Sequence, residues 1–501
     1  LLFIGHYIMS KKLAYVSILF VCIMTAMAGS QLPKLGFNYI FEDFFPIDDN
    51  DLIKYREFTD KFETDNDYLL LGLISENGVF KKNFLAKVDA LTIELEGLDE
   101  IKSVNSITNF KQPIISPVGI YQIPLVNLDE PEKLEKDSVR AYLQSQLTES
   151  FLSKNGKSTL IVIKHLPLNT KEGSDELVDK VMMLANEKAF DDYFMAGKLY
   201  AQGVFIDKIQ DELVTFVSTS IFLVILFLAY AYRSISWVII PLLVVSLSTI
   251  WILGLMAAVG KQLDLLMVLL PTIMFVVGMS DVVHLMTKYI ENLRRGNSKS
   301  LAIKTALKEV GLATFLTSVT TAVGFLTLLT ASIRPIQEFG IYTAAGVLIA
   351  FVVAFTLIPA AWVLQKVPAV SNKKEHESSW VKPLAKSLIY VTKQPLKVIL
   401  ITLAVCLISG FGISRIVINT YLIEDLPADD PLKRSFTFFD EQFGGSRPFE
   451  AIVEVNQSNT TLFNAEVIEE INKVSTYLED TYEVGGLVST NTVVKSLNQA
   501  T

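Results

Sequence analysis

The stretch LDLLMVLLPTIMFVVGMSDVVHLMTKY, residues 263–289, decides how this chain is built. It is apolar and long enough to cross a bilayer, which takes about 20 residues, yet it carries the carboxylate of Asp281 and the imidazole of His284. A charge at the centre of a membrane helix costs about 2.5 to 3.5 kcal/mol, so it normally faces a bundle interior or water. The i, i+3 spacing puts both side chains on one helix face. The stretch therefore predicts a proton-relay helix, with Ser280 beside the acid.

The composition is that of a membrane protein with soluble parts. Of the 501 residues, 51% are hydrophobic and 19% are charged, and the charges fall in separate blocks. The net charge of −9 and the lack of GxxxxGKS/T or strand-linked GxGxxG loops argue against nucleic-acid partners and bound ATP. Cys22 and Cys406 lie in apolar runs and give neither a disulfide framework nor a zinc spacing. We expect no cofactor, a proton gradient as the energy source, and no enzymatic activity, since no nucleophile–base set can be assembled.

The chain opens with a candidate membrane helix. We assign residues 1–12 to a cytoplasmic tail, eight of which precede Met9, and residues 13–29 to the first membrane helix. Ala26-Met27-Ala28 is similar to a signal-peptidase site, so a cleaved signal peptide is the alternative. A second helix with a similar soluble continuation occurs later in the chain, and this repetition favours an uncleaved helix.

An acidic soluble domain follows, over residues 30–212. It holds 32 acidic and 20 basic residues and no apolar run of membrane length. Strand-like and helix-period stretches alternate in it, which predicts two β-α-β units and a split βαβ, ferredoxin-like arrangement. The expected strands are residues 68–75, 103–109 and 158–165, and the expected helices are residues 84–98 and 174–190.

Residues 213–363 hold five apolar segments that we expect to be the second to sixth membrane helices. Six lysines and arginines lie between residues 288 and 308, whereas the short connections at the opposite ends carry fewer. By the positive-inside rule, the N-terminus is cytoplasmic and the acidic domain is periplasmic. The expected spans are residues 213–232, 237–259, 263–288, 312–332 and 339–363.

The rest of the chain divides into three parts. Residues 364–395 are expected to be a cytoplasmic linker, part of which could lie along the membrane surface, and residues 396–411 a seventh membrane helix. Residues 412–501 are polar and are interpreted as the start of a second periplasmic domain.

An internal repeat links the two soluble parts. EDFFPIDD at residues 42–49 corresponds to EDLPADD at residues 424–430, with Asp430 lying 381 residues after Asp49. Each motif is followed by a short aromatic helix, an apolar strand (YLLLGLIS or FEAIVEV), a helix and a β-rich stretch (SVNSITN or GLVSTNT). Four elements in the same order after a membrane helix indicate a duplication, an organisation typical of transporters.

These motifs resemble the resistance-nodulation-division (RND) superfamily, and within it the MMPL-type exporters and the Patched-like proteins with a sterol-sensing domain. The resemblance is densest over residues 278–329 and 340–359. In that family the fourth helix commonly reads G-V-D-D or G-V-D-Y, and its acid is implicated in proton coupling. This chain has Gly278-Met279-Ser280-Asp281, so Ser280 replaces one acid of a pair. We infer that His284 takes the place of the missing proton-exchanging partner.

The fifth helix carries a hydroxyl cluster that is similar to the family's polar T-S-x-T-T stretch beside the relay acid. Hydroxyls can hydrogen-bond a carboxylate within a bundle, although membrane Ser and Thr often bond their own preceding carbonyls instead. Close helix packing is predicted at three glycines. The hydroxyl cluster is Thr317, Ser318, Thr320 and Thr321, and the glycines are Gly278, Gly311 and Gly324.

The resemblance implies an α-helical polytopic membrane protein with α+β periplasmic domains and an RND-type duplication, here truncated. The expected function is proton-motive-force-driven export of hydrophobic or amphiphilic substrates, with lipids as the expected class, across a bacterial inner (plasma) membrane. The alternative is a non-transporting lipid or sterol-like sensor or scaffold; the acid at position 281 favours export, and the missing second acid favours sensing.

The expected partners are membrane lipids, the substrate, further copies in a homo-oligomer and a missing C-terminal half of the same protein. The repeat offset places the twin of the sixth helix near position ~730, so we expect the reading frame to continue past Thr501.

Overall fold

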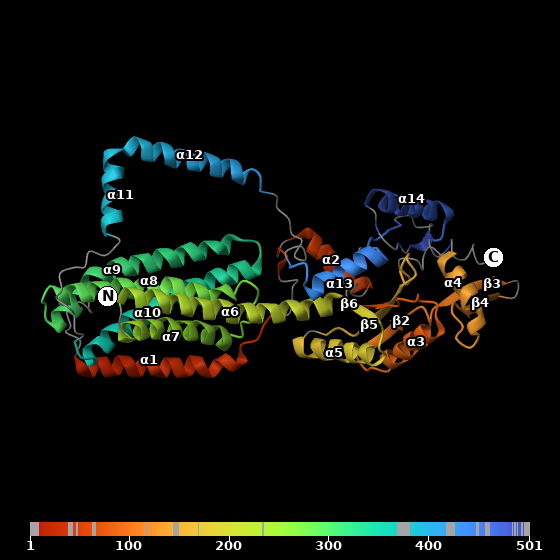
Figure 1. Ribbon diagram of the computed structural model, residues 1–501, viewed down its shortest axis with the longest axis horizontal. Helices are drawn as coiled ribbons and strands as arrows, with labels where there is room; N and C mark the ends of the chain where they lie inside the picture. The colour runs from red at the N-terminus through yellow and green to blue at the C-terminus, as the bar shows by residue number, and fades with distance from the viewer. Residues whose placement is uncertain are drawn as a thin grey trace. The chain divides into compact units, whose positions relative to one another are not determined.

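The computed structural model divides into two compact units, whose elements are labelled in Figure 1. The first unit comprises Leu1–Gly36, Val214–Ala331 and Ile336–Leu422, and the second comprises Phe37–Leu213, Ser332–Pro335 and Ile423–Thr501. The structure describes residues 10–494 except 39–43, 47–48, 63–66, 117–118, 144–149, 169, 233–234, 368–380, 417–425, 447–449, 456–460, 483, 485–486, 488 and 492–493.

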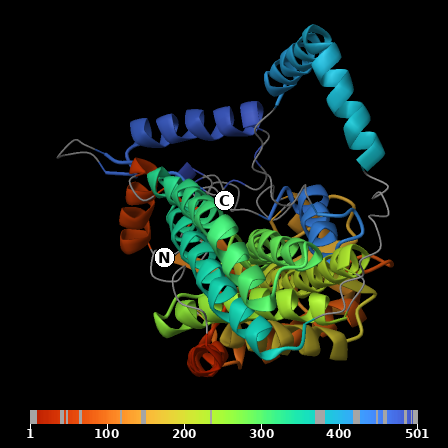
Figure 2. The same cartoon turned by 90° about the vertical axis from the view of Figure 1, so that its left-hand side faces the viewer.

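Seven helices of the described chain are long and apolar enough to cross a membrane, which makes the protein a multi-pass membrane protein. Figure 2 shows the membrane helices from one end. They are α1 (Lys11–Gln31), α6 (Lys198–Tyr232), α7 (Ile235–Ala258), α8 (Leu269–Arg294), α9 (Lys299–Leu326), α10 (Arg334–Leu364) and α12 (Pro395–Ile413).

Three of these helices begin six or more residues away from the start of the apolar run that predicted them. Helix α8 begins at Leu269 rather than 263, because Asp264 Oδ1 accepts the N–H groups of Leu266 and Met267 and holds a turn there. Helix α9 begins 13 residues before position 312, and α6 begins 15 residues before position 213. Hydropathy marks only the part of a helix that needs an apolar surrounding, so charged turns at its ends escape it.

The central helix α8 is held by α7, α9 and α10. The ring of Tyr289 in α8 stacks on Trp362 of α10 with centroids 4.0 Å apart, and the ring centroid of Trp237 in α7 lies 6.1 Å from that of Tyr289. Helix α1 packs against α7, where Trp251 Nε1 donates to Thr25 Oγ1 at 2.9 Å.

A buried ion cluster ties the α7–α8 turn to the start of α10. Lys261 Nζ lies 3.0 Å from Asp264 Oδ2 and also pairs with Glu338. Burial alone would lower the pKa of Lys261, but the two carboxylates outweigh it and the pKa is raised. Ion pairs therefore link the α7–α8 connection to the start of α10, next to the α9–α10 connection.

The second unit is built on a four-stranded sheet in the order β2-β5-β1-β6, in which every neighbouring pair is antiparallel. Helices α3 (Lys82–Glu96) and α5 (Lys171–Glu187) lie on one face of it (Figure 1) and share its largest apolar core. The strands are β1 (Tyr68–Ile74), β2 (Ile101–Asn105), β5 (Ser158–His165) and β6 (Asp192–Ala196). The first three strands and both helices match the expected stretches to within a few residues.

The other face of this sheet is covered by α13 (Pro431–Phe443), which comes from the far end of the chain. Phe439 and Phe443 of α13 pack on Leu70 and Leu160 of the sheet. Strand β1 has glycine at position 72, where a Cβ would overlap a ring from α13. The sheet therefore lies between two helical layers.

The remaining elements take no part in the candidate functional site described below. A hairpin that the sequence reading missed joins β3 and β4, and the expected strand at 449–455 has no paired strand among its described residues, 450–455. Of the β-rich stretch expected at 486–492, residues 486, 488 and 492 lie outside the described residues; of the others none is in a strand, and residues 490 and 491 are helical. The peripheral elements are α2 (Asn50–Phe62), β3 (Lys111–Ser116), β4 (Gly119–Pro124), α4 (Leu134–Leu143), α11 (Val381–Lys393) and α14 (Ala465–Tyr482).

Candidate functional site

The candidate site lies between α8 and α9, which run antiparallel to each other. The connection between them is short because Gly296 adopts a positive φ of 83° and Ser298 caps α9 by accepting the N–H of Leu301. This turn brings the acid-bearing face of α8 against the hydroxyl-bearing face of α9.

Asp281 is held by Ser318 across this helix pair. The Ser318 hydroxyl lies 3.0 Å from Asp281 Oδ2 and 2.9 Å from the carbonyl oxygen of Thr314, one turn earlier in α9. Only 6% of Asp281 and 3% of Ser318 is exposed. Because a hydroxyl has one hydrogen, Ser318 can donate to the carboxylate or to the carbonyl, but not fully to both.

A cavity of about 460 Å³ adjoins the acid. Ser280, Asp281 and His284 line it from α8, so the structure brings together the three relay residues that the sequence singled out. From α9 the cavity is lined by hydroxyls and small apolar groups. These residues are Thr314, Thr317, Ser318, Thr321, Val310 and Ala313.

The other predicted hydroxyls take different positions. Thr317 Oγ1 donates to the carbonyl of Thr314 at 2.8 Å while lining the cavity, which combines both expected behaviours. Thr320 Oγ1 donates to the carbonyl of Thr317 at 2.9 Å and is not among the residues that line the cavity. In the part of the chain that the structure describes, Ser318 is the one member of the cluster that is hydrogen-bonded to the Asp281 carboxylate.

The three predicted packing glycines differ in their surroundings. A Cβ at Gly278 would lie 3.4 Å from a methyl group of Val245, and one at Gly311 would lie 3.5 Å from the ring of Phe355. Gly324 faces open space among the described residues, so no helix contact there accounts for it.

The sequence reading missed the charged residues at one end of the cavity. Glu309 of α9 lines the same cavity as Asp281, and the ammonium of Lys288 in α8 lies 2.9 Å from the Glu309 carboxylate. Glu291 pairs with the same lysine at 3.1 Å. In the sequence, Lys288 serves only as a topology signal. Its position seven residues after Asp281 puts it on the same helix face, and that spacing is the signal that could have identified it as part of the site.

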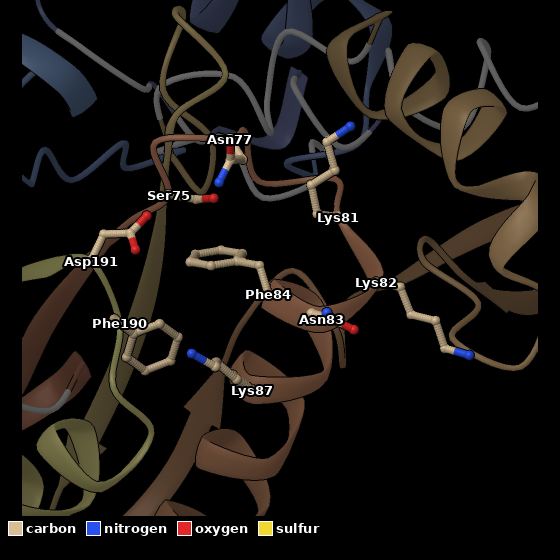
Figure 3. Close-up of a pocket in the computed structure, with 9 residues that line it drawn as sticks. All are labelled: Ser75, Asn77, Lys81, Lys82, Asn83, Phe84, Lys87, Phe190 and Asp191. Atoms are coloured by element: carbon tan, nitrogen blue, oxygen red, sulfur yellow. The ribbon is translucent and has the colours of Figure 1, made fainter.

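A second cavity, of about 530 Å³, lies in the second unit beside α3 (Figure 3). Phe84 and Phe190 pack edge to face in it, and the ammonium of Lys87 points toward Phe190 while donating to a backbone carbonyl at 2.7 Å. Lys81 and Lys82 point away from the two rings in Figure 3. The cations that could bind an anion are thus turned outward or used within the fold.

No group of three His, Cys, Asp or Glu side chains in the described part of the chain is arranged to hold a metal ion.

The fold and the site together define a polytopic membrane protein with an ionisable group buried between its helices, a combination that marks ion or substrate pathways. The chain belongs to the MMPL family, which matches residues 89–389.

Two relatives set this family membership in context. A membrane protein of Methanocaldococcus jannaschii is 27% identical over 376 residues, covering 72% of this chain and 93% of that protein. The apo-petrobactin exporter of Bacillus anthracis is 24% identical over 375 residues, covering 67% of this chain and 50% of the exporter. The family and the exporter support transport across a membrane.

Proposed function

We propose that this protein exports hydrophobic or amphiphilic molecules, with lipids as the expected class, in exchange for protons across a bacterial inner membrane. The observation that carries the proposal is the Asp281–Ser318 hydrogen bond beside a cavity in the membrane unit. A carboxylate within a membrane helix is expensive to keep, so its presence beside a cavity favours an ionisable working group. No chemical conversion of the substrate is required.

The two acceptors of Ser318 suggest how protonation reaches the helices. When Asp281 is charged, the Ser318 hydroxyl donates to the carboxylate. When a proton binds a carboxylate oxygen, the new O–H group can donate to Ser318 Oγ, and the Ser318 hydrogen turns to the carbonyl of Thr314. Loading one proton therefore changes which bonds join α8 to α9, and this is the event that we propose alternates the helix pair.

The soluble unit is proposed to be a periplasmic, ferredoxin-like domain, with the N-terminus of the chain in the cytoplasm. The antiparallel strand order β2-β5-β1-β6, with α3 and α5 on one face, supports that topology. The basic connection between α8 and α9 supports the orientation.

The proposed duplication is supported by two helices. Helices α2 and α13 each have 13 residues and are 381 positions apart. They begin alike, since Asp49 Oδ1 accepts the N–H of Asp51 at 2.7 Å and Asp430 Oδ1 accepts that of Leu432 at 2.9 Å. The same cap at the same offset is expected of a repeated unit.

A lipid sensor that does not transport is the second candidate. It is favoured by Ser280, which stands where the resembled motif has a second acid. A sensor would need the cavity but not a proton at Asp281, so the acid discriminates between the two functions.

The test replaces Asp281 with Asn in the full protein, reconstituted in liposomes with an imposed pH gradient and loaded with a lipophilic dye. We expect the variant to insert normally and to lose gradient-dependent dye export, because the amide cannot take up the proton. Thr320→Ala, which alters a hydroxyl outside the cavity, is the matched control. Gradient-dependent dye export at the normal rate by Asp281→Asn would overturn the role of Asp281 in proton coupling, whereas the absence of gradient-dependent export by the unmodified protein would favour the sensor.

A further inference from the structure

The cavity beside Asp281 reaches a second carboxylate, that of Glu309, which lies nine residues before Ser318 in α9 and so about two and a half turns closer to the α8–α9 connection. The two acids differ in their access to water, because the Glu309 side chain is 47% exposed whereas Asp281 is 6% exposed. The cavity therefore joins a buried acid to one that solvent can reach.

Asp281 and His284 of α8 line the cavity, and Lys288 follows them on the same helix. His284 and Lys288 come three and seven residues after Asp281, which keeps them on one helix face. At a rise of about 1.5 Å per residue, His284 stands about 4.5 Å and Lys288 about 10 Å from the acid along the helix axis. The imidazole is thus placed between the two carboxylates.

Lys288 forms an ion pair with Glu309, the more exposed of the two acids that line the cavity. Its ammonium lies 2.9 Å from Glu309 Oε2 on α9 and 3.1 Å from Glu291 Oε2 on its own helix. Glu309 lines the cavity, whereas Glu291 is not among the lining residues. Within the described part of the chain, the titratable groups that line the cavity are Asp281, His284 and Glu309.

We propose that Glu309 is the residue through which Asp281 exchanges protons with water on the side of the α8–α9 connection. Glu309 takes a proton from water and gives it to His284 across the cavity, and the imidazolium gives a proton to the Asp281 carboxylate. Glu309 and His284 each gain one proton and lose one, Asp281 keeps the transferred proton, and release follows the same steps in reverse. The inference rests on the proposed proton coupling and supplies the second acid that the α8 motif lacks.

A purely structural role for Glu309 makes a different prediction. An exposed ion pair contributes little to stability, and Lys288 would keep Glu291 as a partner if Glu309 were neutralised. In that case Glu309→Gln and Glu291→Gln should behave alike.

The experiment follows the carboxyl infrared band of Asp281 after a pH jump, in the purified full-length chain in lipid nanodiscs. The band is assigned by its loss in Asp281→Asn. We expect Glu309→Gln to slow proton exchange at Asp281 by about tenfold or more, because a positioned acid–base group contributes roughly 10²- to 10⁴-fold to proton transfer. Glu309→Asp should restore most of the rate, and Glu291→Gln should exchange like the unmodified protein.

The outcomes separate this inference from the proposed function. Equal rates in Glu309→Gln and Glu291→Gln would overturn the role of Glu309, even if Asp281→Asn abolishes dye export. An Asp281 band that does not respond to pH at all would overturn both proposals together. Slow exchange in Glu309→Gln that Glu309→Asp restores supports the inference and excludes a folding defect as its cause.

Discussion

Ser318 is the residue that converts a buried acid into a link between two helices. Its single hydroxyl hydrogen has two acceptors, Asp281 Oδ2 and the carbonyl of Thr314, at nearly equal distances. The neighbouring hydroxyls of Thr317 and Thr320 bond carbonyls of their own helix. The role of a hydroxyl in this cluster therefore depends on which face of α9 it occupies.

Replacing Ser318 with Ala should slow dye export by about tenfold to a hundredfold. A hydrogen bond to a charged group contributes about 1.5 to 3 kcal/mol, and without it Asp281 is less able to release its proton. Initial export rates in the liposome assay measure the effect, with Thr320→Ala as the matched control. Equal rates for the two variants would show that the bond to Asp281 plays no part in the cycle.

At the scale of elements, α13 is the helix whose position the sequence order least suggests. It lies beyond all seven candidate membrane helices, yet it covers one face of the sheet formed by residues 68–196. Asp430 holds its first turn by capping Leu432 N–H and by pairing with Lys208 of α6. Burial alone would raise the pKa of Asp430, but the lysine and the backbone N–H groups hold the pKa below its ordinary value.

This lowered pKa predicts how the docking of α13 depends on pH. A carboxyl whose pKa is lower in the folded state stabilises the fold above its ordinary pKa of about 3.9, and that contribution is lost as the pH falls through the folded value. Lys208→Met should cost roughly 2 kcal/mol and move the loss to higher pH, since only the backbone N–H groups then oppose the effect of burial on the pKa of Asp430. Hydrogen exchange of α13 amides between about pH 3 and pH 7 measures both effects.

The control for this experiment is Lys180→Met. Lys180 pairs with Glu100 beneath the opposite face of the sheet, so its loss should leave α13 protected. Exchange of the α13 amides that is unchanged in Lys208→Met would show that the aromatic contacts alone hold the helix.

At the scale of the whole molecule, the proposed orientation puts Asn186 of α5 outside the cytoplasm and Ser300 of α9 inside it. Both positions are exposed. We expect Asn186→Cys, in a background without Cys22 and Cys406, to react with a membrane-impermeant thiol reagent in spheroplasts. Ser300→Cys should react only after permeabilisation. The reverse pattern would invert the orientation and with it the direction of export.

Local patterns were enough to predict the membrane class, the family, three strands and two helices of the first acidic part, and the shared helix face of Asp281 and His284. These follow from signals that lie close together in the chain: the length of apolar runs, the i, i+3 spacing of Asp281 and His284, and the period of strands and helices. Local spacing fixes which side chains share a face, whatever the rest of the fold does.

Contacts between side chains of different helices and strands could not be predicted from the sequence and are visible only in the folded structure. Of four similar hydroxyls, that of Ser318 contacts Asp281. Glu309 lines the same cavity as Asp281 and pairs with Lys288, and α13 packs on the sheet. Each of these depends on the rotation of one helix against another or on contacts between segments far apart in the chain. Such contacts are set by packing of whole surfaces, and a linear pattern does not contain them.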